Sequence, residues 1–298
     1  MKKIFSLFIL FYFSNAAAQN YVDLARFHYS TTPLNSFDSV AGNTTVEDMG
    51  LDVTLPIVLD EKNAVLTGFN VDKMTAKLPP NSNPTTISTI NLKIGYNKKH
   101  TEKWSGTYLF LPKISSNFKN LSAKAYQFGG LILMKYTRQE NLKYNLGVYY
   151  NGELFGPFVV PLFGLYYKSN NEKFEINLTL PIWGDMNYKL NNTIKIGANF
   201  AAFVRSYHLG ESNTYLAKKS NDLFAYLQFN LTKNIVLQTK TGYSIGRTLK
   251  VYEENDKTDL AFSAFRFGDD RTVLNPTFKD GMIFKIRLLY RFHIEKVK

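Results

Sequence analysis

Histidine is the side chain that most often moves protons or binds metals near neutral pH, and this sequence has four of them. His28, His100, His208 and His293 show no metal-ligand spacing with one another or with a carboxylate. Cysteine is absent, which excludes thiolate catalysis, disulfide bonds and cysteine-based metal sites. We therefore expect neither a metal centre nor a cofactor.

Serine hydrolase chemistry needs a serine near a histidine that a third group orients. Ser206 and His208 lie two residues apart, so on a β-strand they would share one face. They have no recognisable orienting partner, and no serine lies in a Gly-x-Ser-x-Gly elbow. A polar strand end explains the pair better, and the acidic pairs Glu253–Glu254 and Asp269–Asp270 are interpreted as solvated charge. The sequence therefore predicts that the protein is not an enzyme.

Positive charge is the remaining chemical feature, because the formal net charge is +12 and the isoelectric point is about 9.5. Where apolar residues alternate with others, the non-apolar face carries many basic residues: Lys93, Lys135, Lys143, Lys168, Lys173, Lys189, Lys195, Arg205, Lys240, Lys285, Arg287 and Arg291. The acids expected on that face are Asp52, Asp72, Glu175 and Asp222. Basic rings inside a pore favour anions. The alternative is that several of these lysines reach water at a pore mouth.

The elements that must position these charges are β-strands, because alternation with a period of two dominates the chain. Met49–Ile57, Ile90–Tyr96, Phe174–Leu180 and Phe284–Phe292 show it clearly. A soluble β-sandwich has the same period, but its outer face would be charged rather than a mixture of Asn, Gln, Thr, Gly, Lys and Arg. We expect these side chains to face lipid: Ile90, Leu92, Ile94, Phe174, Ile176, Leu178, Phe284, Ile286 and Leu288. We expect these to face a lumen: Lys93, Glu175, Asn177, Lys285 and Arg287.

Aromatic residues make up 15% of the chain and gather near the predicted strand ends. The examples are Tyr96, Trp104, Tyr136, Tyr144, Tyr167, Phe174, Tyr188 and Tyr290. Aromatic belts at two membrane interfaces explain that placement. After the N-terminal region, no segment is apolar for the 18 or so residues that a spanning helix needs. The combination indicates a closed antiparallel transmembrane β-barrel.

The connections allow the strands to be counted. Short polar turns are expected at Asp60–Asn63, Arg138–Asn141, Ser169–Glu172, Asn191–Asn192 and Thr232–Asn234. Longer connections are expected at Thr31–Thr45, Lys77–Pro84, Pro112–Ala123, Leu209–Ser220 and Thr248–Gly281. We predict about 14 strands, with 12 or 16 as alternatives, short turns at the end that holds both termini and long loops opposite. Asp185–Leu190 is the weakest strand, and Leu260–Phe267 could form an extra hairpin.

The N-terminal residues are typical of an export signal. Lys2 and Lys3 precede the apolar run Ile4–Phe13, and Ala16–Ala18 supplies the small residues that signal peptidase reads. We expect a signal peptide over residues 1–18 and a barrel domain over residues 19–298. The alternative is an uncleaved N-terminal anchor.

The C-terminal strand carries a second targeting feature. Ile283–Phe292 is amphipathic and ends in an aromatic residue, which resembles the signal that the barrel-assembly machinery reads, with Phe292 as the assembly-signal residue. The tail His293–Lys298 departs from that pattern. With motifs such as Met186–Asn192, the mature chain resembles the uncharacterised outer-membrane β-barrel domain family of Bacteroidetes-type bacteria. The resemblance implies a fold and a location, and no substrate.

Three functions are compatible with these features. The first is a passive, porin-like channel for small solutes with a mild anion preference, since the width of the barrel and the inward glycines Gly68, Gly95, Gly129, Gly147, Gly164, Gly197 and Gly242 would leave space. The second is a barrel anchor whose external loops bind a partner, and the third is a lipid-modifying enzyme. The expected location is the outer membrane of a Gram-negative cell. The expected partners are outer-membrane lipid and lipopolysaccharide, the assembly machinery and small anionic solutes, but not nucleic acid.

Overall fold

The computed structural model describes residues 21–293, and nearly all of its regular structure is β-strand. The predicted signal peptide lies outside the described residues. The elements are β1 (Tyr21–Ser36), β2 (Asn43–Val58), β3 (Asn63–Ala76), β4 (Thr85–Lys99), β5 (Trp104–Ser116), η1 (Ala123–Ala125), β6 (Tyr126–Gln139), β7 (Leu142–Glu153), β8 (Gly156–Lys168), β9 (Phe174–Leu180), β10 (Trp183–Lys189), β11 (Ile194–Leu209), β12 (Thr214–Asn230), β13 (Ile235–Glu253), β14 (Leu260–Phe262), β15 (Phe265–Phe267) and β16 (Met282–His293). Within residues 21–293, no helix is long and apolar enough to cross a lipid bilayer.

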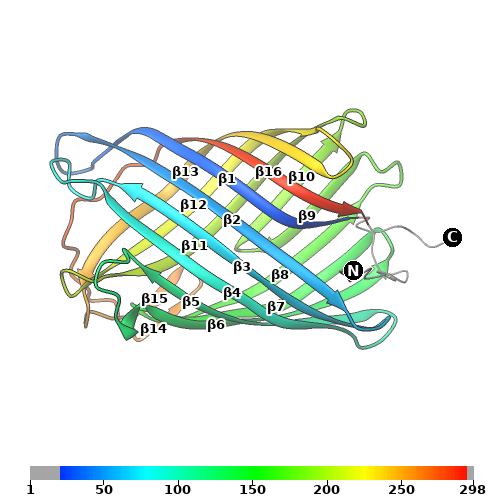
Figure 1. Ribbon diagram of the computed structural model, residues 1–298, viewed down its shortest axis with the longest axis horizontal. Coiled ribbons are helices and arrows are strands. Elements are labelled where there is room, and N and C mark those ends of the chain that lie inside the picture. The colour runs from blue at the N-terminus through cyan, green and yellow to red at the C-terminus, as the bar shows by residue number, and fades with distance from the viewer. Residues whose placement is uncertain (1–20, 294–298) are drawn as a thin grey trace, which may run out of the picture.

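The strands form a closed antiparallel barrel of 14 strands (Figure 1). Each strand from β1 to β13 pairs with its neighbour in sequence, β13 pairs with β16, and β16 pairs with β1. The first and last described residues, Tyr21 and His293, face each other across that last pairing. Strands β14 and β15 lie outside the closed wall. The predicted strand number is therefore confirmed, including the weak tenth strand, which is β10.

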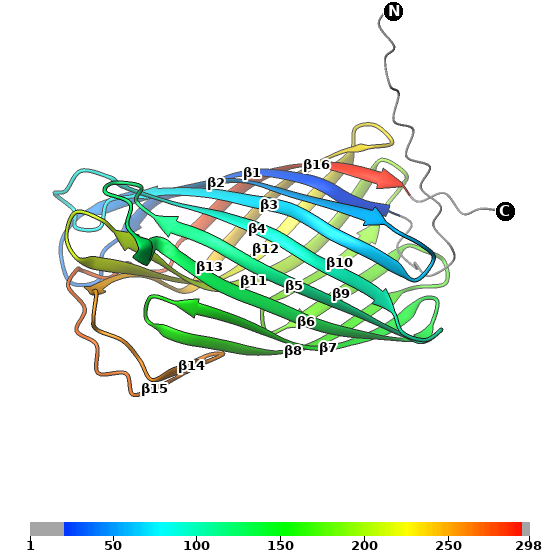
Figure 2. The ribbon, with the colours of Figure 1, turned by 60° about the horizontal axis from the view of Figure 1, so that its bottom comes forward.

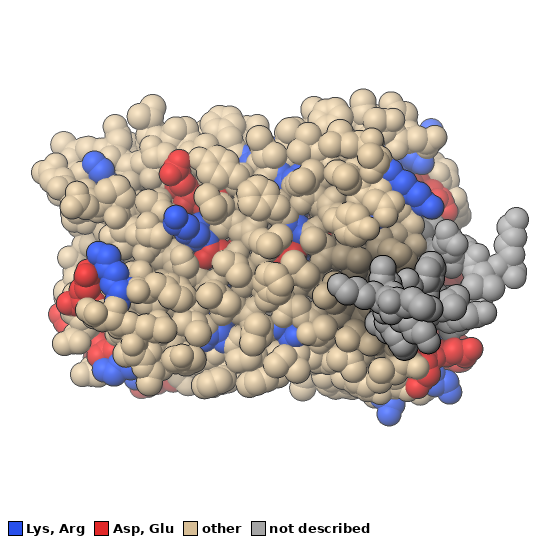
Figure 3. Space-filling model, in the orientation of Figure 1, with Lys and Arg blue, Asp and Glu red and all other residues tan. Residues whose placement is uncertain are grey.

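The alternating pattern places apolar side chains on the outside of the wall. Ile90, Leu92, Ile94, Phe284, Ile286 and Leu288 are between 39% and 54% exposed. Phe174, Ile176 and Leu178 share this outward face but are only half-exposed. Most of the face shown in Figure 3 is uncharged, with scattered Lys, Arg, Asp and Glu side chains along the wall and more at its two ends. A single closed sheet with an apolar exterior excludes the sandwich alternative, in which these side chains would lie between two sheets.

Aromatic rings form a belt at the end of the barrel where β1 begins and β16 ends, which we call the terminal end. Trp104 and Tyr136 pair across β5 and β6 with ring centroids 5.0 Å apart. Tyr167 and Phe174 lie 6.5 Å apart across β8 and β9. These rings lie at one level because alternate strands end there, as expected for an interfacial belt.

The short turns lie at the terminal end, as the sequence predicts, and the long loops lie at the opposite end, which we call the outer end (Figure 1). Four expected loops are shorter than predicted. β1 continues to Ser36, β2 begins at Asn43 and β5 continues to Ser116. Leu209–Ser220 is mostly strand, since β12 begins at Thr214, and β13 continues through Thr248 to Glu253. On the side away from the terminal end, two-residue connections also join β7 to β8 and β9 to β10. The alternation of long and short connections therefore holds only in part. β9 and β10 end about halfway along the wall and are joined by a short turn there, whereas β11, β12 and β13 continue toward the outer end and shorten the loops between them.

The wall changes its pairing in the outer half. β9 and β10 have seven residues each, so the outer half of β8 has no partner in β9. There, Phe158 and Val159 of β8 pair with Ala261 and Phe262 of β14 instead. The β14–β15 hairpin thus covers an exposed strand edge, and it lies beside the outer end of β8 in Figure 2. The hairpin expected at Leu260–Phe267 is confirmed.

Two apolar clusters lie in the outer half of the barrel. The first, which we call the rim cluster, joins β2, β3 and β4 to β11, β12 and β13: Phe37, Val46, Met74, Ala76, Leu78, Ile87, Tyr207, Leu209, Leu216, Leu249, Val251 and Phe278. The second, the side cluster, lies between β8, β14 and the tips of β12 and β13: Phe155, Phe158, Val160, Leu162, Tyr215, Tyr252 and Ala261. Strands that are not neighbours in the wall meet in both clusters, so the outer half is filled rather than hollow.

Candidate functional site

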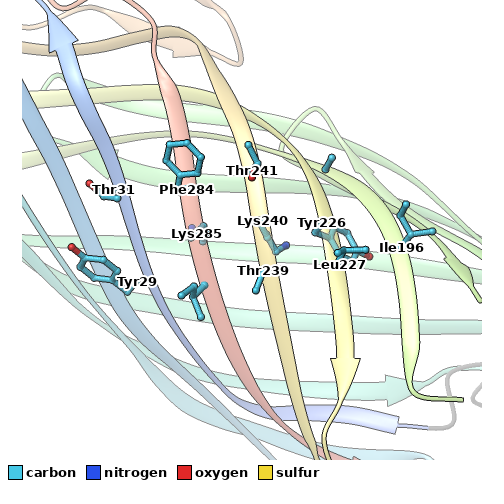
Figure 4. Close-up of a pocket in the computed structure, with 12 residues that line it drawn as sticks. Tyr29, Thr31, Ile196, Tyr226, Leu227, Thr239, Lys240, Thr241, Phe284 and Lys285 are labelled. Carbon is cyan, nitrogen blue, oxygen red and sulfur yellow. The ribbon is translucent and has the colours of Figure 1, made fainter.

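The inward face of β13 and β16 carries a cluster of three cations. Lys240 of β13 lies directly opposite Lys285 of β16 (Figure 4). Gln238 lies opposite Arg287 on the same two strands. Lys240 contacts the Asn199 side-chain oxygen at 3.2 Å, and its ammonium lies over the Tyr226 ring. Within residues 21–293, none of the three cations has a carboxylate oxygen within ion-pairing distance. Like charges on adjacent strands repel each other, so the cluster favours a bound or passing anion.

The other predicted basic residues divide into two groups. Lys93 and Arg205 are neutralised, since Lys93 contacts Asp52 at 2.6 Å and Arg205 contacts Asp72 at 2.6 Å. Lys135, Lys143 and Lys195 lie on inward positions of β6, β7 and β11 near the terminal end. These three lysines line the lumen at the terminal end, at the level of the aromatic belt. The alternative interpretation, in which lysines reach water at a pore mouth, predicts the same position. Lys173 lies in the turn before β9, outside the strands.

The inward face holds more acids than the sequence pattern predicts. Asp23 pairs with Arg291 at 2.7 Å, and Asp48 pairs with Lys218 at 2.9 Å and with His28 at 2.8 Å. Other inward acids with no place in the predicted set are Glu153 and Asp185. The bulge between Asp23 and Ala25 turns Asp23 inward against the local alternation. Asp48 has the same inward parity as the predicted Asp52, so the alternation does signal it.

Ion pairs across the lumen bind the outer half together. Lys218 of β12 and Asp48 of β2 are on strands separated in the wall by β13, β16 and β1. Arg205 of β11 reaches Asp72 of β3, and the guanidinium of Arg247 donates to the Thr32 hydroxyl at 2.8 Å. The rim cluster lies on the same strands. The structure therefore shows a lumen that is closed at its outer end.

The inward glycines do not widen the lumen, contrary to the expectation from the sequence. A methyl group at Gly197 would meet the Tyr226 ring, and one at Gly242 would meet the Phe224 ring. At Gly95 it would meet the Leu109 side chain. These glycines make room for large side chains from the neighbouring strand, which lie over the backbone and occupy the lumen.

A buried polar network connects β5, β7 and β11. Lys113 contacts Glu153 at 2.8 Å, and their side chains are 5% and 0% exposed. The hydroxyl and backbone N–H of Ser206 both donate to Glu153, at 2.6 and 2.7 Å. The network holds the outer half of β11 against the inner face of β5 and β7. Ser206 therefore has a structural partner and is not paired with His208, so the candidate serine–histidine pair of the sequence does not form.

A different serine lies next to His208. The hydroxyl of Ser122, in the loop before η1, is 3.1 Å from His208 Nε2. His208 Nδ1 is 3.7 Å from an oxygen of Glu254, which follows β13, and the second oxygen of Glu254 pairs with Lys124. No spacing in the sequence signals this arrangement, because Ser122 and His208 are 86 residues apart. Glu254 was interpreted as solvated charge, but its side chain is only 14% exposed.

Phe292 lies at the end of β16 opposite Val22 of β1. This closing position is compatible with its expected role in assembly, which stays a prediction.

Among the described residues, no group of three or more His, Asp or Glu side chains could hold a metal ion. A shallow groove of about 520 Å³ crosses the outer face of the wall, with Thr239 and Thr241 between the larger Phe284 and Leu227 (Figure 4).

Comparisons with solved structures find outer-membrane channels. One is a channel of Pseudomonas putida F1 described as the COG4313 outer membrane channel, with a TM-score of 0.44, 8% identity, and coverage of 90% of this chain and 94% of that one. Another is the P. putida toluene transporter TodX, with a TM-score of 0.43, 10% identity, and coverage of 94% and 93%. A third is the NanC porin, with a TM-score of 0.36, 11% identity, and coverage of 89% and 98%. At these identities the likeness extends to the barrel architecture alone.

No curated protein matches the sequence. The expected origin in a Bacteroidetes-type bacterium stays a prediction. A family model described as a domain of unknown function, DUF6268, matches residues 14–291, which is nearly the whole sequence, and the chain therefore belongs to the DUF6268 family.

Proposed function

We propose that this protein is an outer-membrane channel for small anionic solutes, closed at its outer end in the state described here. Its apolar exterior and closed pairing suit a lipid bilayer, in which every backbone polar group of the wall must be satisfied. Lipopolysaccharide and outer-membrane lipid would surround the wall, and the barrel-assembly machinery would insert it. Solved outer-membrane channels share this architecture.

The observation that carries the anion preference is the cation cluster of Lys240, Lys285 and Arg287. Asp23, Asp48 and Asp52 pair with other cations. Asp185 accepts a hydrogen bond from Tyr226, whose ring lies beneath the Lys240 ammonium, so this one carboxylate offsets only part of the charge of the three cations. A wall of low dielectric around unpaired cations concentrates anions and raises their rate of passage. Passage through the whole barrel requires the rim cluster to loosen, since its side chains occupy the outer lumen.

Reversal potentials across a salt gradient in a planar bilayer test the proposal. We expect brief or infrequent openings with an anion preference, which Lys285→Gln with Arg287→Gln should reduce. Lys73→Gln with Lys219→Gln is the matched control, because both lysines are exposed on the outer face of the wall and the double variant removes two positive charges outside the lumen. Leu216→Gly, in the rim cluster, should increase the open probability.

A cation-selective pore would contradict the anion preference. If neither the wild-type barrel nor the Leu216→Gly variant conducts, the channel function itself is wrong, and a barrel that anchors external binding loops becomes the better account.

A further inference from the structure

We propose that Ser122, His208 and Glu254 form a serine hydrolase site at the outer rim of the barrel, a function separate from the proposed channel. The three residues come from the loop before η1, the end of β11 and the segment after β13. The Ser122 hydroxyl lies 3.1 Å from His208 Nε2, and His208 Nδ1 lies 3.7 Å from Glu254 Oε1. This is the order nucleophile, base and orienting acid that recurs on unrelated folds.

Two atoms of this site lack partners in the surrounding protein. His208 Nδ1 and Glu254 Oε1 are both buried without a hydrogen bond. A buried polar atom without a partner is unfavourable, and these two atoms face each other at slightly more than hydrogen-bond distance. A small rotation of either side chain lets Nδ1–H donate to the carboxylate. That bond fixes the tautomer in which Nε2 accepts the serine proton.

The second oxygen of Glu254 is held by Lys124, which follows Ser122 by two residues. The ion pair fixes the carboxylate relative to the serine loop, so nucleophile and acid cannot move apart independently. A merely structural role for Ser122 is also visible, since its hydroxyl accepts the Lys124 N–H at 3.3 Å at the start of η1. The hydrogen bond from the Lys124 N–H accounts for the turn at the start of η1. It does not account for the buried His208 and Glu254 side chains, which face each other on the far side of the imidazole from Ser122.

The surroundings of Ser122 indicate the class of substrate. Phe118, Leu121 and Tyr126 are exposed at 42%, 47% and 50%. The Lys119 and Lys124 side chains pair with Glu211 and Glu254 but stay exposed at 64% and 58%. Tyr126 begins β6 on its outward face, so the serine lies just beyond the apolar wall. Apolar and cationic side chains beside a nucleophile at this level suit an acyl ester of an anionic lipid in the outer leaflet.

The reaction is an ester hydrolysis in two steps. The Ser122 oxygen attacks the ester carbonyl carbon while its proton passes to His208 Nε2, and the departing alcohol oxygen takes that proton as the carbon–oxygen bond breaks. Water then attacks the acyl-serine, giving one proton to His208, which returns it to the Ser122 oxygen as the fatty acid leaves. The products are one alcohol and one fatty acid.

The test uses the full-length folded barrel with two readouts. The first is covalent labelling by a fluorophosphonate, and the second is release of fatty acid from vesicles that contain phosphatidylglycerol. We expect the wild-type protein to be labelled and active, and Ser122→Ala to abolish both. His208→Gln and Glu254→Gln should each reduce hydrolysis by about 10²–10⁴-fold, because the serine loses its base or the base loses its orientation.

Ser212→Ala is the matched control, because Ser212 is in a turn at the same end and its hydroxyl bonds only to Thr214 among the described residues. It should leave labelling and hydrolysis unchanged. Gel mobility with and without heating confirms that each variant is a folded barrel. A wild-type protein that is neither labelled nor active overturns the proposal, as does labelling that survives in Ser122→Ala. Bilayer conductance of Ser122→Ala should match wild type, so this test and the channel test fail independently.

Discussion

At the scale of single residues, ion pairing rather than burial separates two groups of inward charges, since Lys240 is as buried as Lys113. Lys113 and Glu153 are almost completely buried and hydrogen-bonded, whereas Lys240, Lys285 and Arg287 have no carboxylate partner within residues 21–293. A buried ion pair adds little stability over an apolar pair, but the loss of one partner leaves an uncompensated charge in a low dielectric. The first group therefore fixes the fold of the outer half, and the second leaves positive charge in the lumen that no carboxylate pairs with among residues 21–293.

We predict that Glu153→Gln lowers the free energy of unfolding by about 3–5 kcal/mol. The substitution leaves the buried Lys113 ammonium without a carboxylate and weakens both hydrogen bonds that Ser206 donates. The double variant Lys113→Met with Glu153→Met should recover a large part of that loss. Urea unfolding in lipid bilayers measures both. Equal losses in the single and double variants would show that the pair does not act as a unit.

At the scale of elements, the outer half is organised by the unequal lengths of the strands. β9 and β10 have seven residues each, whereas β11, β12 and β13 have 16, 17 and 19. The long strands lose their neighbour on one side and lean across the lumen, where His208 of β11 pairs with Ser116 of β5. The β14–β15 hairpin then protects the free edge of β8, since unpaired backbone groups in a wall are costly.

The docking of this hairpin depends on Ala261, which is fully buried in the side cluster. We predict that Ala261→Glu releases the hairpin, because the side cluster has no room for a longer side chain at this fully buried position, although Arg266 lies opposite it in β15. Limited proteolysis should then cut the loop between β13 and β16 much faster than in wild type. Phe265→Glu, at a position 68% exposed, should leave the cleavage rate unchanged. Equal cleavage of the two variants would mean that the hairpin is not held by Ala261.

At the scale of the whole molecule, the barrel is asymmetric along its axis. The terminal half has a lumen lined by basic side chains, and the outer half is filled by the rim cluster, the cross-lumen ion pairs and the side cluster. On the proposed channel function, we therefore expect solutes to enter from the terminal end more readily than from the outer end. This asymmetry also places the Ser122 site on the outer side of the closure, apart from the cation cluster.

Single cysteines test the asymmetry, because the chain has no native cysteine. In intact cells without general porins, a charged thiol reagent should label Asn83→Cys in the loop between β3 and β4 but not Lys135→Cys in the lumen. After the outer membrane is permeabilised, Lys135→Cys should react as well, since its position is exposed toward the terminal end. Rapid labelling of Lys135→Cys in intact cells would mean that the outer end is open.

The sequence by itself determined the barrel, its strand number and the outward face, because the period of two repeats in every strand and one-residue slips would expose the wrong face. Phe284, Ile286 and Leu288 illustrate this, since neighbouring residues alone decide which side is apolar. Only the tertiary structure decided that the outer half is closed and that inward glycines are covered by rings. It alone brought Ser122 to His208, across 86 residues, and Lys218 to Asp48, across 170. Contacts across the lumen depend on how long the strands are and how far they tilt toward each other. Local alternation of apolar and polar residues does not encode either property.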